Sequence, residues 1–198
     1  MTPRERYQID LQKDGFIADS QQEKAVGFTQ QLYDELMQRD RYQPGLLERM
    51  LGRKPAIIKG LYFWGSTGRG KTYLMDCFYE CLPLVRKHRV HFHRFMLDIH
   101  EQLRCLPKSP DPLIIVANRI AEKVQVLCLD EFHVHDIADA MLMGGLLQAL
   151  FDKGVILMAT SNIAIDDLYL NGLQRERFLF AIELLQTYTT EIELEGST

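Results

Sequence analysis

Apolar residues along the chain follow two patterns that alternate. Short runs that contain apolar and β-branched residues predict strands at 57–64, 89–94, 124–130, 155–160 and 189–195. Apolar residues at three- and four-residue spacing predict helices at 71–82, 96–106, 137–151 and 175–186. Strands that alternate with helices predict an α/β fold with a mostly parallel central sheet.

The first part of the chain has a different pattern. It is polar and contains one further amphipathic helix, predicted at 22–39 and capped by Asp19 or Ser20. A stretch marked by prolines and glycines follows this helix. We therefore expect an N-terminal helical segment and linker at 1–55 and a single core domain at 56–198.

Composition limits the classes of protein to which the chain can belong. Of its 198 residues, 46% are hydrophobic and 25% are charged, which is enough apolar material for a packed core and argues against disorder. No run approaches the ~20 apolar residues of a membrane-spanning helix, so we expect none. The net charge, 23 − 27 = −4, argues against non-specific nucleic-acid binding.

The N-terminus and the cysteines bear on the compartment. The first residues lack the apolar stretch of a secretory signal, and their acidic residues argue against a mitochondrial presequence. No paired C-x-x-C spacing occurs among Cys77, Cys81, Cys105 and Cys128. We expect reduced, packed thiols in a cytoplasmic protein.

A glycine-rich segment follows the first strand of the core. It matches G-x-x-x-x-G-K-[ST] at every fixed position over Gly65, Ser66, Thr67, Gly68, Arg69, Gly70, Lys71 and Thr72. Glycines let successive backbone N–H groups face an anion, and the helix that follows adds its positive end. In this motif the lysine reaches the β- and γ-phosphates and the hydroxyl binds Mg²⁺. A chance match in a flexible loop is the alternative, but the strand before and the helix after favour a nucleotide site.

Two further strands end in polar residues that suit such a site. Asp130 and Glu131 follow an apolar strand, where Asp130 can bind Mg²⁺ through water and Glu131 can orient an attacking water. An acidic pair alone could merely cap a loop. Beside a phosphate loop it favours hydrolysis of a nucleoside triphosphate by water. Asn162 follows the next strand and is predicted to lie between the γ-phosphate and the water, although an ordinary turn is the alternative.

Two arginines lie further along, before the last predicted helix. On a monomer, Arg175 and Arg177 would be solvated surface charges. In a ring of subunits, one of them could reach the γ-phosphate of a neighbour, where such a cation can be worth roughly 10³–10⁵ in rate.

Taken together, these motifs resemble AAA+ ATPases, and more narrowly the ZapE-type (AFG-like) family of bacterial cell-division ATPases. The stretches that carry the resemblance are 60–65, 68–72, 91–96, 130–132, 136–140 and 171–175. It spans nearly the whole chain. It implies an AAA+ core with strand order 5-1-4-3-2, ATP and Mg²⁺ as ligands, and a hexameric or otherwise oligomeric active form. It also implies work on the cell-division ring, with FtsZ as partner, in the cytoplasm and at the division site.

The chain departs from the family pattern in several places. Ser66 and Thr67 replace a Gly-Val pair at variable loop positions, and Phe180 replaces a proline near a helix start. Family members continue into a helical lid with a second sensor arginine, whereas this sequence stops at Thr198, so we expect the lid to be absent. Two other functions stay open: a nucleic-acid-linked ATPase of the helicase-loader type, and a scaffold that binds nucleotide without turnover.

Other groups of residues have plainer interpretations. His91 and His93 alternate on a predicted strand, and His133 and His135 follow the acidic pair, so a zinc site is conceivable but packing is favoured. The basic cluster 86–89 is interpreted as a solvated loop rather than a nucleic-acid contact. The segment 189–195 is predicted to be an edge strand with its acidic side chains facing outward.

Overall fold

The computed structural model describes residues 1–13, 20–41, 57–68 and 70–194. Its helices are α1 Pro3–Asp10, α2 Ser20–Arg41, α4 Lys71–Cys81, α5 Phe92–Cys105, α6 Pro112–Lys123, α7 Ile137–Asp152 and α8 Arg175–Tyr188, with a short 3₁₀ turn at Ile165–Asp167. Its strands are β1 Gly60–Trp64, β2 Lys87–His91, β3 Val126–Asp130, β4 Ile156–Ser161 and β5 Thr189–Glu193. The chain thus alternates strands and helices, as its sequence predicts.

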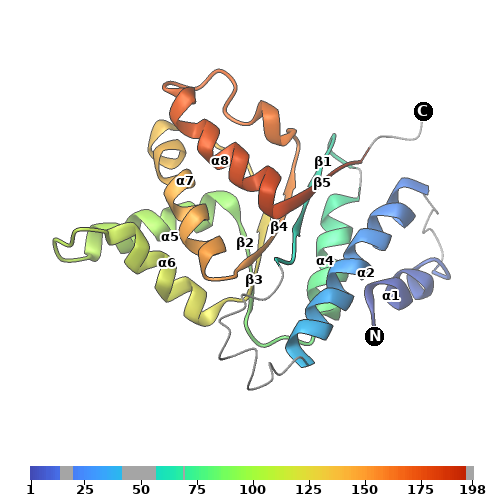
Figure 1. Ribbon diagram of the computed structural model, residues 1–198. Coiled ribbons are helices and arrows are strands. Elements are labelled where there is room, and N and C mark those ends of the chain that lie inside the picture. Colours follow the sequence, from blue (N-terminus) through green and yellow to red (C-terminus); the bar gives the residue numbers. More distant parts are fainter. Residues whose placement is uncertain (14–19, 42–56, 69, 195–198) are drawn as a thin grey trace.

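All five strands form one parallel sheet, in the order β2-β3-β4-β1-β5 (Figure 1). Read in reverse, this is the order 5-1-4-3-2, so the predicted fold class is confirmed. β4 lies between β3 and β1, with Ala159 in register with both Leu129 and Tyr62. The carboxyl ends of β1, β3 and β4 therefore meet at one edge of the sheet, where ligands of open α/β sheets bind.

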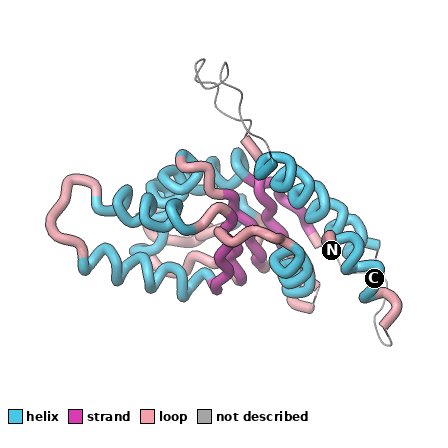
Figure 2. The backbone as a smooth tube through the Cα atoms, turned by 90° about the horizontal axis from the view of Figure 1, so that it is seen from below, coloured by secondary structure: helices cyan, strands magenta, loops and turns pink. Residues whose placement is uncertain are grey.

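Helices cover both faces of the sheet, with the strands between them (Figures 1 and 2). α1, α2 and α4 lie on one side, and α5 to α8 lie on the other. Alternate residues of β1, β3 and β4 divide between two hydrophobic clusters: Phe63 packs in the cluster with α2 and α4, and Tyr62 packs in the cluster with α5 to α8. The N-terminal helices thus share a core with the sheet.

Two helices have start signals that the hydrophobic pattern did not reveal. α1 begins with a capping box, in which Thr2 and Glu5 each accept a hydrogen bond from the other's backbone N–H group, and Pro3 occupies its first turn. α6 begins with Pro112, another residue typical of a first turn.

The prediction of a strand at 89–94 is wrong at its end. β2 stops at His91, and α5 begins at Phe92. Phe92, Phe95 and Ile99 are buried on α5 at helical spacing, so the helical pattern starts several residues earlier than predicted. His93 therefore belongs to a helix and not to the strand that carries His91.

The cysteine prediction holds in part. Cys77, Cys81 and Cys128 are buried free thiols, and burial raises the pKa of Cys128 to about 12. Cys105 is exposed, because it is the last residue of α5, so it is not packed as predicted. Among the described residues, no helix has the length and apolar character needed to cross a bilayer.

Candidate active site

A cleft of about 410 Å³ opens at the carboxyl edge of the sheet. It is lined by Thr67, Gly68, Gly70, Lys71 and Thr72 from the glycine-rich loop and α4, and by Arg89, His91, Asp130, Glu131, Thr160, Ser161 and Asn162 from three strand ends. The structure thus brings most of the predicted site residues together. Arg69 lies outside the described residues.

The loop that leads into α4 has a backbone that only glycine adopts readily. Gly65, Gly68 and Gly70 have φ angles of 148°, 80° and 76°. A Cβ on Gly65 would lie 2.5 Å from the carbonyl oxygen of Leu194, so this position excludes a side chain for steric reasons as well. Gly70 is the N-cap of α4 and supplies no side-chain cap, which leaves the positive end of the helix open to an anion.

Lys71 folds back over this loop. Its Nζ donates hydrogen bonds to the carbonyl oxygens of Gly65, at 2.5 Å, and Ser66, at 2.7 Å. Gly65 and Ser66 thus hold the ammonium group over the loop rather than lining the cleft themselves. The cation lies where the motif places phosphate groups, and it would exchange carbonyl oxygens for phosphate oxygens when a nucleotide binds.

Asp130, the last residue of β3, is buried and bound to an arginine. Arg89 Nε donates to Asp130 Oδ2 at 2.7 Å, and Arg89 Nη2 donates to Oδ1 at 3.4 Å. Arg89 Nη1 also pairs with Asp76 on α4. Burial of the guanidinium lowers its pKa, but the hydrogen bonds to Asp130 and Asp76 outweigh burial, so the pKa of Arg89 is raised. Residues 87–89 lie in β2, and Lys87 Nζ donates to the carbonyl oxygens of Tyr79 and Leu82. The interpretation of 86–89 as a solvated loop is therefore wrong for Lys87 and Arg89.

Glu131 has an unusual backbone for a residue with a side chain. Its φ angle is 56°, in the left-handed region, and its N–H donates to Thr160 Oγ1 at 3.2 Å. The sharp bend after β3 leaves the Glu131 side chain 81% exposed, with its Oε2 3.8 Å from His91 Nδ1. A carboxylate so placed at the cleft can accept a proton from a water molecule.

The loop after β3 is tied to the end of β4. Phe132 N donates to the carbonyl oxygen of Thr160 at 2.7 Å, and Ser161 Oγ donates to the carbonyl oxygen of Phe132 at 2.7 Å. Asn162, the next residue, is exposed and lines the cleft. These bonds fix the segment that carries Glu131 against the segment that carries Asn162. Sequence reasoning missed the roles of Thr160 and Ser161, although polar residues at the end of a buried strand are a signal for them.

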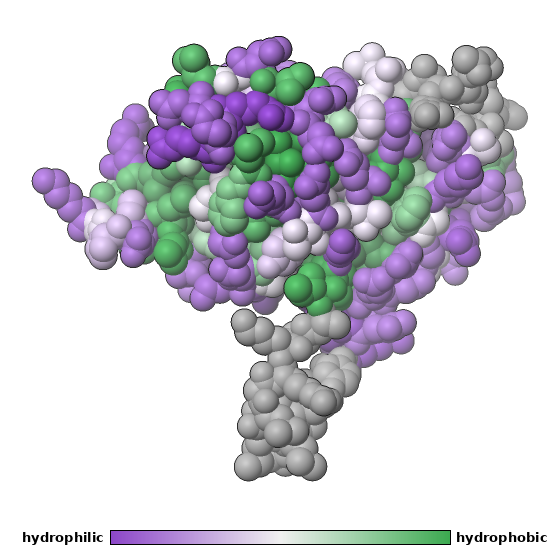
Figure 3. Space-filling model, turned by 45° about the horizontal axis from the view of Figure 1, so that its top comes forward, coloured by the Kyte–Doolittle hydropathy of each residue, from purple (hydrophilic) through white to green (hydrophobic). Residues whose placement is uncertain are grey.

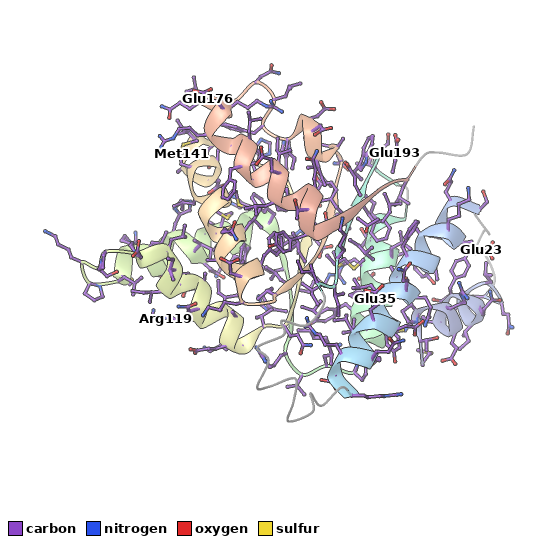
Figure 4. All side chains as sticks on the ribbon, viewed as in Figure 1. Glu23, Glu35, Arg119, Met141, Glu176 and Glu193 are labelled. Carbon is purple, nitrogen blue, oxygen red and sulfur yellow. The ribbon has the colours of Figure 1, made fainter. Side chains whose placement is uncertain are left out.

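Arg175 and Arg177 do not line the cleft of their own chain. Arg175 Nη2 donates to the carbonyl oxygen of Asp166 at 2.5 Å, and Arg177 Nη1 donates to Gln174 Oε1 at 3.0 Å. Glu176, between them, lies at the outer end of α8 (Figure 4). Both arginines are thus held by hydrogen bonds near the start of α8 and not at the cleft.

The cleft contains side-chain oxygen atoms that are suitable ligands for Mg²⁺. The Thr72 hydroxyl group and the carboxylates of Asp130 and Glu131 all face it, and hydroxyl and carboxylate oxygens are the ligands that hard cations prefer. Of the four histidines that could form a zinc site, only His91 lines this cleft. His133 and His135 stack with ring centroids 3.6 Å apart, and His93 is on α5. Within the described residues, no group of three or more His, Cys, Asp or Glu side chains is placed to hold a metal.

Comparison with known proteins gives matches over the whole chain. The family model described as AFG1-like ATPase matches residues 1–198. The chain is 47% identical over 206 residues to the cell division protein ZapE of Escherichia coli K12, and the match covers 99% of this chain and 55% of that protein. The chain therefore spans about half the length of this curated relative.

Solved structures resemble the fold. The crystal structure of DnaI has a TM-score of 0.63 at 23% identity and covers 92% of this chain and 89% of its own. That of the DnaC helicase loader has a TM-score of 0.58 at 13% identity, with coverages of 92% and 95%. At these identities the likeness extends to the fold alone.

Proposed function

Because the chain belongs to the AFG1-like ATPase family, we propose that it binds ATP with Mg²⁺ in the cleft and hydrolyses it to ADP and phosphate. One observation carries the proposal: Lys71 and Thr72, at the start of α4, share the cleft with Asp130 and Glu131, at the end of β3. A phosphate-binding loop beside a pair of carboxylates is the arrangement that hydrolysis of a phosphoanhydride requires.

The residues at the cleft have separate roles in this reaction. The glycine-rich loop and Lys71 bind the phosphates. Thr72 and Asp130 would hold Mg²⁺, which would neutralise charge on the transferred group. Glu131 orients the attacking water and takes its proton, and Asn162 contacts the γ-phosphate from the neighbouring strand.

The first test uses a lysine variant. Lys71→Ala removes the ammonium group from the loop, so nucleotide binding should weaken at least tenfold and phosphate release should cease. Isothermal titration with ATP and Mg²⁺, together with a phosphate-release assay, measures both. Lys59→Ala, at an exposed lysine just before β1, is the matched control and should behave as the wild type. Unchanged affinity in Lys71→Ala would refute this assignment of the site.

The cellular role is proposed from the relative. ZapE is named a cell division protein, and the 47% identity covers 99% of this chain. We propose that this chain is the ATPase core of a protein that remodels the cell-division ring in the cytoplasm at the division site, as an oligomer, through FtsZ polymers. Co-sedimentation with FtsZ polymers, with ATP or without nucleotide, tests this role. Absence of any nucleotide-dependent change in the polymers would contradict it.

A further inference from the structure

Arg89 reaches the cleft from the edge strand of the sheet. β2 pairs with β3 so that Arg89 is in register with Cys128, which places the Arg89 side chain on the same face as Asp130. α4 covers that face and contributes Asp76, one helical turn after Thr72. The Arg89 side chain is 22% exposed, and its guanidinium group bridges the two carboxylates.

One of the carboxylates that Arg89 contacts, Asp130, is the one proposed to hold the metal. Both carboxylate oxygens of Asp130 accept from the guanidinium, and Asp76 shares it. The Asp130 side chain is only 11% exposed, so water screens its charge poorly. Arg89 Nε lies 2.7 Å from Asp130 Oδ2, so the two side chains form a close ion pair at the cleft.

We propose that Arg89 is a stand-in counter-ion at the metal site: it neutralises Asp130 and Asp76 while the cleft lacks Mg²⁺, and it releases part of its contact with Asp130 when the metal arrives. This rests on the proposed function, in which Asp130 holds Mg²⁺. Arg89 is then a positioning residue, which acts on metal and nucleotide through the carboxylate it binds.

Loss of Arg89 should change two affinities in opposite directions: the affinity for a divalent cation and the affinity for metal-free nucleotide. Without the guanidinium, two uncompensated carboxylates attract a divalent cation more strongly, even when no nucleotide is present. The same carboxylates repel the phosphates of a nucleotide that arrives without metal. Loss of Arg89 should therefore tighten metal binding and weaken metal-free nucleotide binding.

The first experiment uses Mn²⁺ alone as the probe, titrated into nucleotide-free protein and followed by electron paramagnetic resonance. Arg89→Met should bind Mn²⁺ about tenfold more tightly than the wild type. Arg89→Lys, which keeps the cation, should stay near the wild type, and Arg89→Met/Asp130→Asn should lose the gain. Arg86→Met is the matched control, because Arg86 is exposed and donates to the carbonyl oxygen of Ala121. Equal Mn²⁺ affinity in Arg89→Met and the wild type would overturn the proposal.

The second experiment measures the affinity of a fluorescent ATP analogue with Mg²⁺ and with a chelator. In Arg89→Met the affinity should fall about tenfold more in chelator than in Mg²⁺. An equal fall in both conditions would show that Arg89 contacts the nucleotide or merely stabilises the fold, and would refute the stand-in role. If the wild type binds no nucleotide, the proposed function fails while the Mn²⁺ titration still decides on Arg89. Should Arg89→Met not fold, Arg89→Gln removes the charge, keeps a hydrogen-bond donor and carries the same expectations.

Discussion

At the scale of single residues, a substitution of Glu131 should reduce ATP turnover but leave ATP binding nearly unchanged. Glu131→Gln keeps the size of the side chain but cannot accept a proton from water, and it leaves the contacts of Lys71 and Asp130 unchanged. ATP binding should stay within about twofold of the wild type, while turnover should fall at least 10²-fold. Glu122→Gln, at an exposed glutamate on α6, is the control. A variant that turns over ATP at the normal rate would place the general base elsewhere.

The site residues differ in how far the sequence could reveal them. Lys71, Thr72 and Asp130 belong to motifs whose spacing along the chain is itself the signal. Arg89 could not be found in this way, because its partner Asp130 is distant in sequence and adjacent only through the pairing of β2 with β3. The run of basic residues at 86–89 did not reveal that it enters a strand, nor which face of the sheet Arg89 occupies.

At the scale of elements, α1 is fixed to the helix that begins at the phosphate loop. Asp10 is buried, accepts from the Tyr73 hydroxyl group of α4 at 2.9 Å, and pairs with Arg6 and Lys13. Burial raises the pKa of Asp10, but the hydrogen bonds from Lys13 and Tyr73 and the charges of Lys13 and Arg6 lower it by more, so the pKa of Asp10 lies below the ordinary value of an aspartate.

A variant of Asp10 tests this attachment and its pH dependence. Asp10→Asn should lower the free energy of unfolding by about 1–3 kcal/mol near pH 7, because both ion pairs are lost. A carboxyl group whose pKa is lowered by folding stabilises the protein above its unfolded pKa, and this contribution disappears as pH falls through the folded pKa. The difference from the wild type in thermal melts should therefore shrink below about pH 4. Asp34→Asn, at an exposed aspartate on α2, should show neither effect.

Helices and strands could be predicted from the sequence where a segment shows a single pattern of apolar residues. β1, β3 and β4 stand out as apolar runs, and the alternation of strands with helices indicates a parallel sheet. The start of α5 was obscured because the β-like residues of β2 run directly into the buried face that begins with Phe92. α1 has little apolar character and is held by its capping box and by Asp10, so periodicity could not reveal it.

At the scale of the whole molecule, Arg175 and Arg177 lie away from the cleft of their own chain, among exposed apolar residues that include Leu173 and Phe180. Figure 3 shows apolar patches between hydrophilic residues on the face that it views. If one arginine completes the site of a neighbouring subunit, ATP hydrolysis per subunit should rise with protein concentration.

Mixing two inactive variants tests this. Arg175→Ala/Arg177→Ala protein retains its own Glu131, and Glu131→Gln protein retains its arginines, so mixed assemblies should recover part of the activity that each lacks alone. Phosphate release across mixing ratios, alongside sedimentation to detect assemblies, measures the effect. No recovery where mixed assemblies form, or turnover independent of concentration, would show that neither arginine completes the site of a neighbouring subunit.

The left-handed backbone of Glu131 lowers the free energy of unfolding of this protein, although it places a carboxylate at the cleft. A residue with a Cβ at a φ angle of 56° is less stable there than glycine would be, by an amount on the order of 1 kcal/mol. Glu131→Gly should therefore unfold at a temperature equal to or above that of Glu131→Ala, although both lose turnover, and differential scanning calorimetry of the pair measures the difference. A lower unfolding temperature for the glycine variant would show that the bend after β3 costs nothing. Selection for stability alone would favour glycine at this position. A glutamate is retained only where the function of its carboxylate outweighs the lost stability.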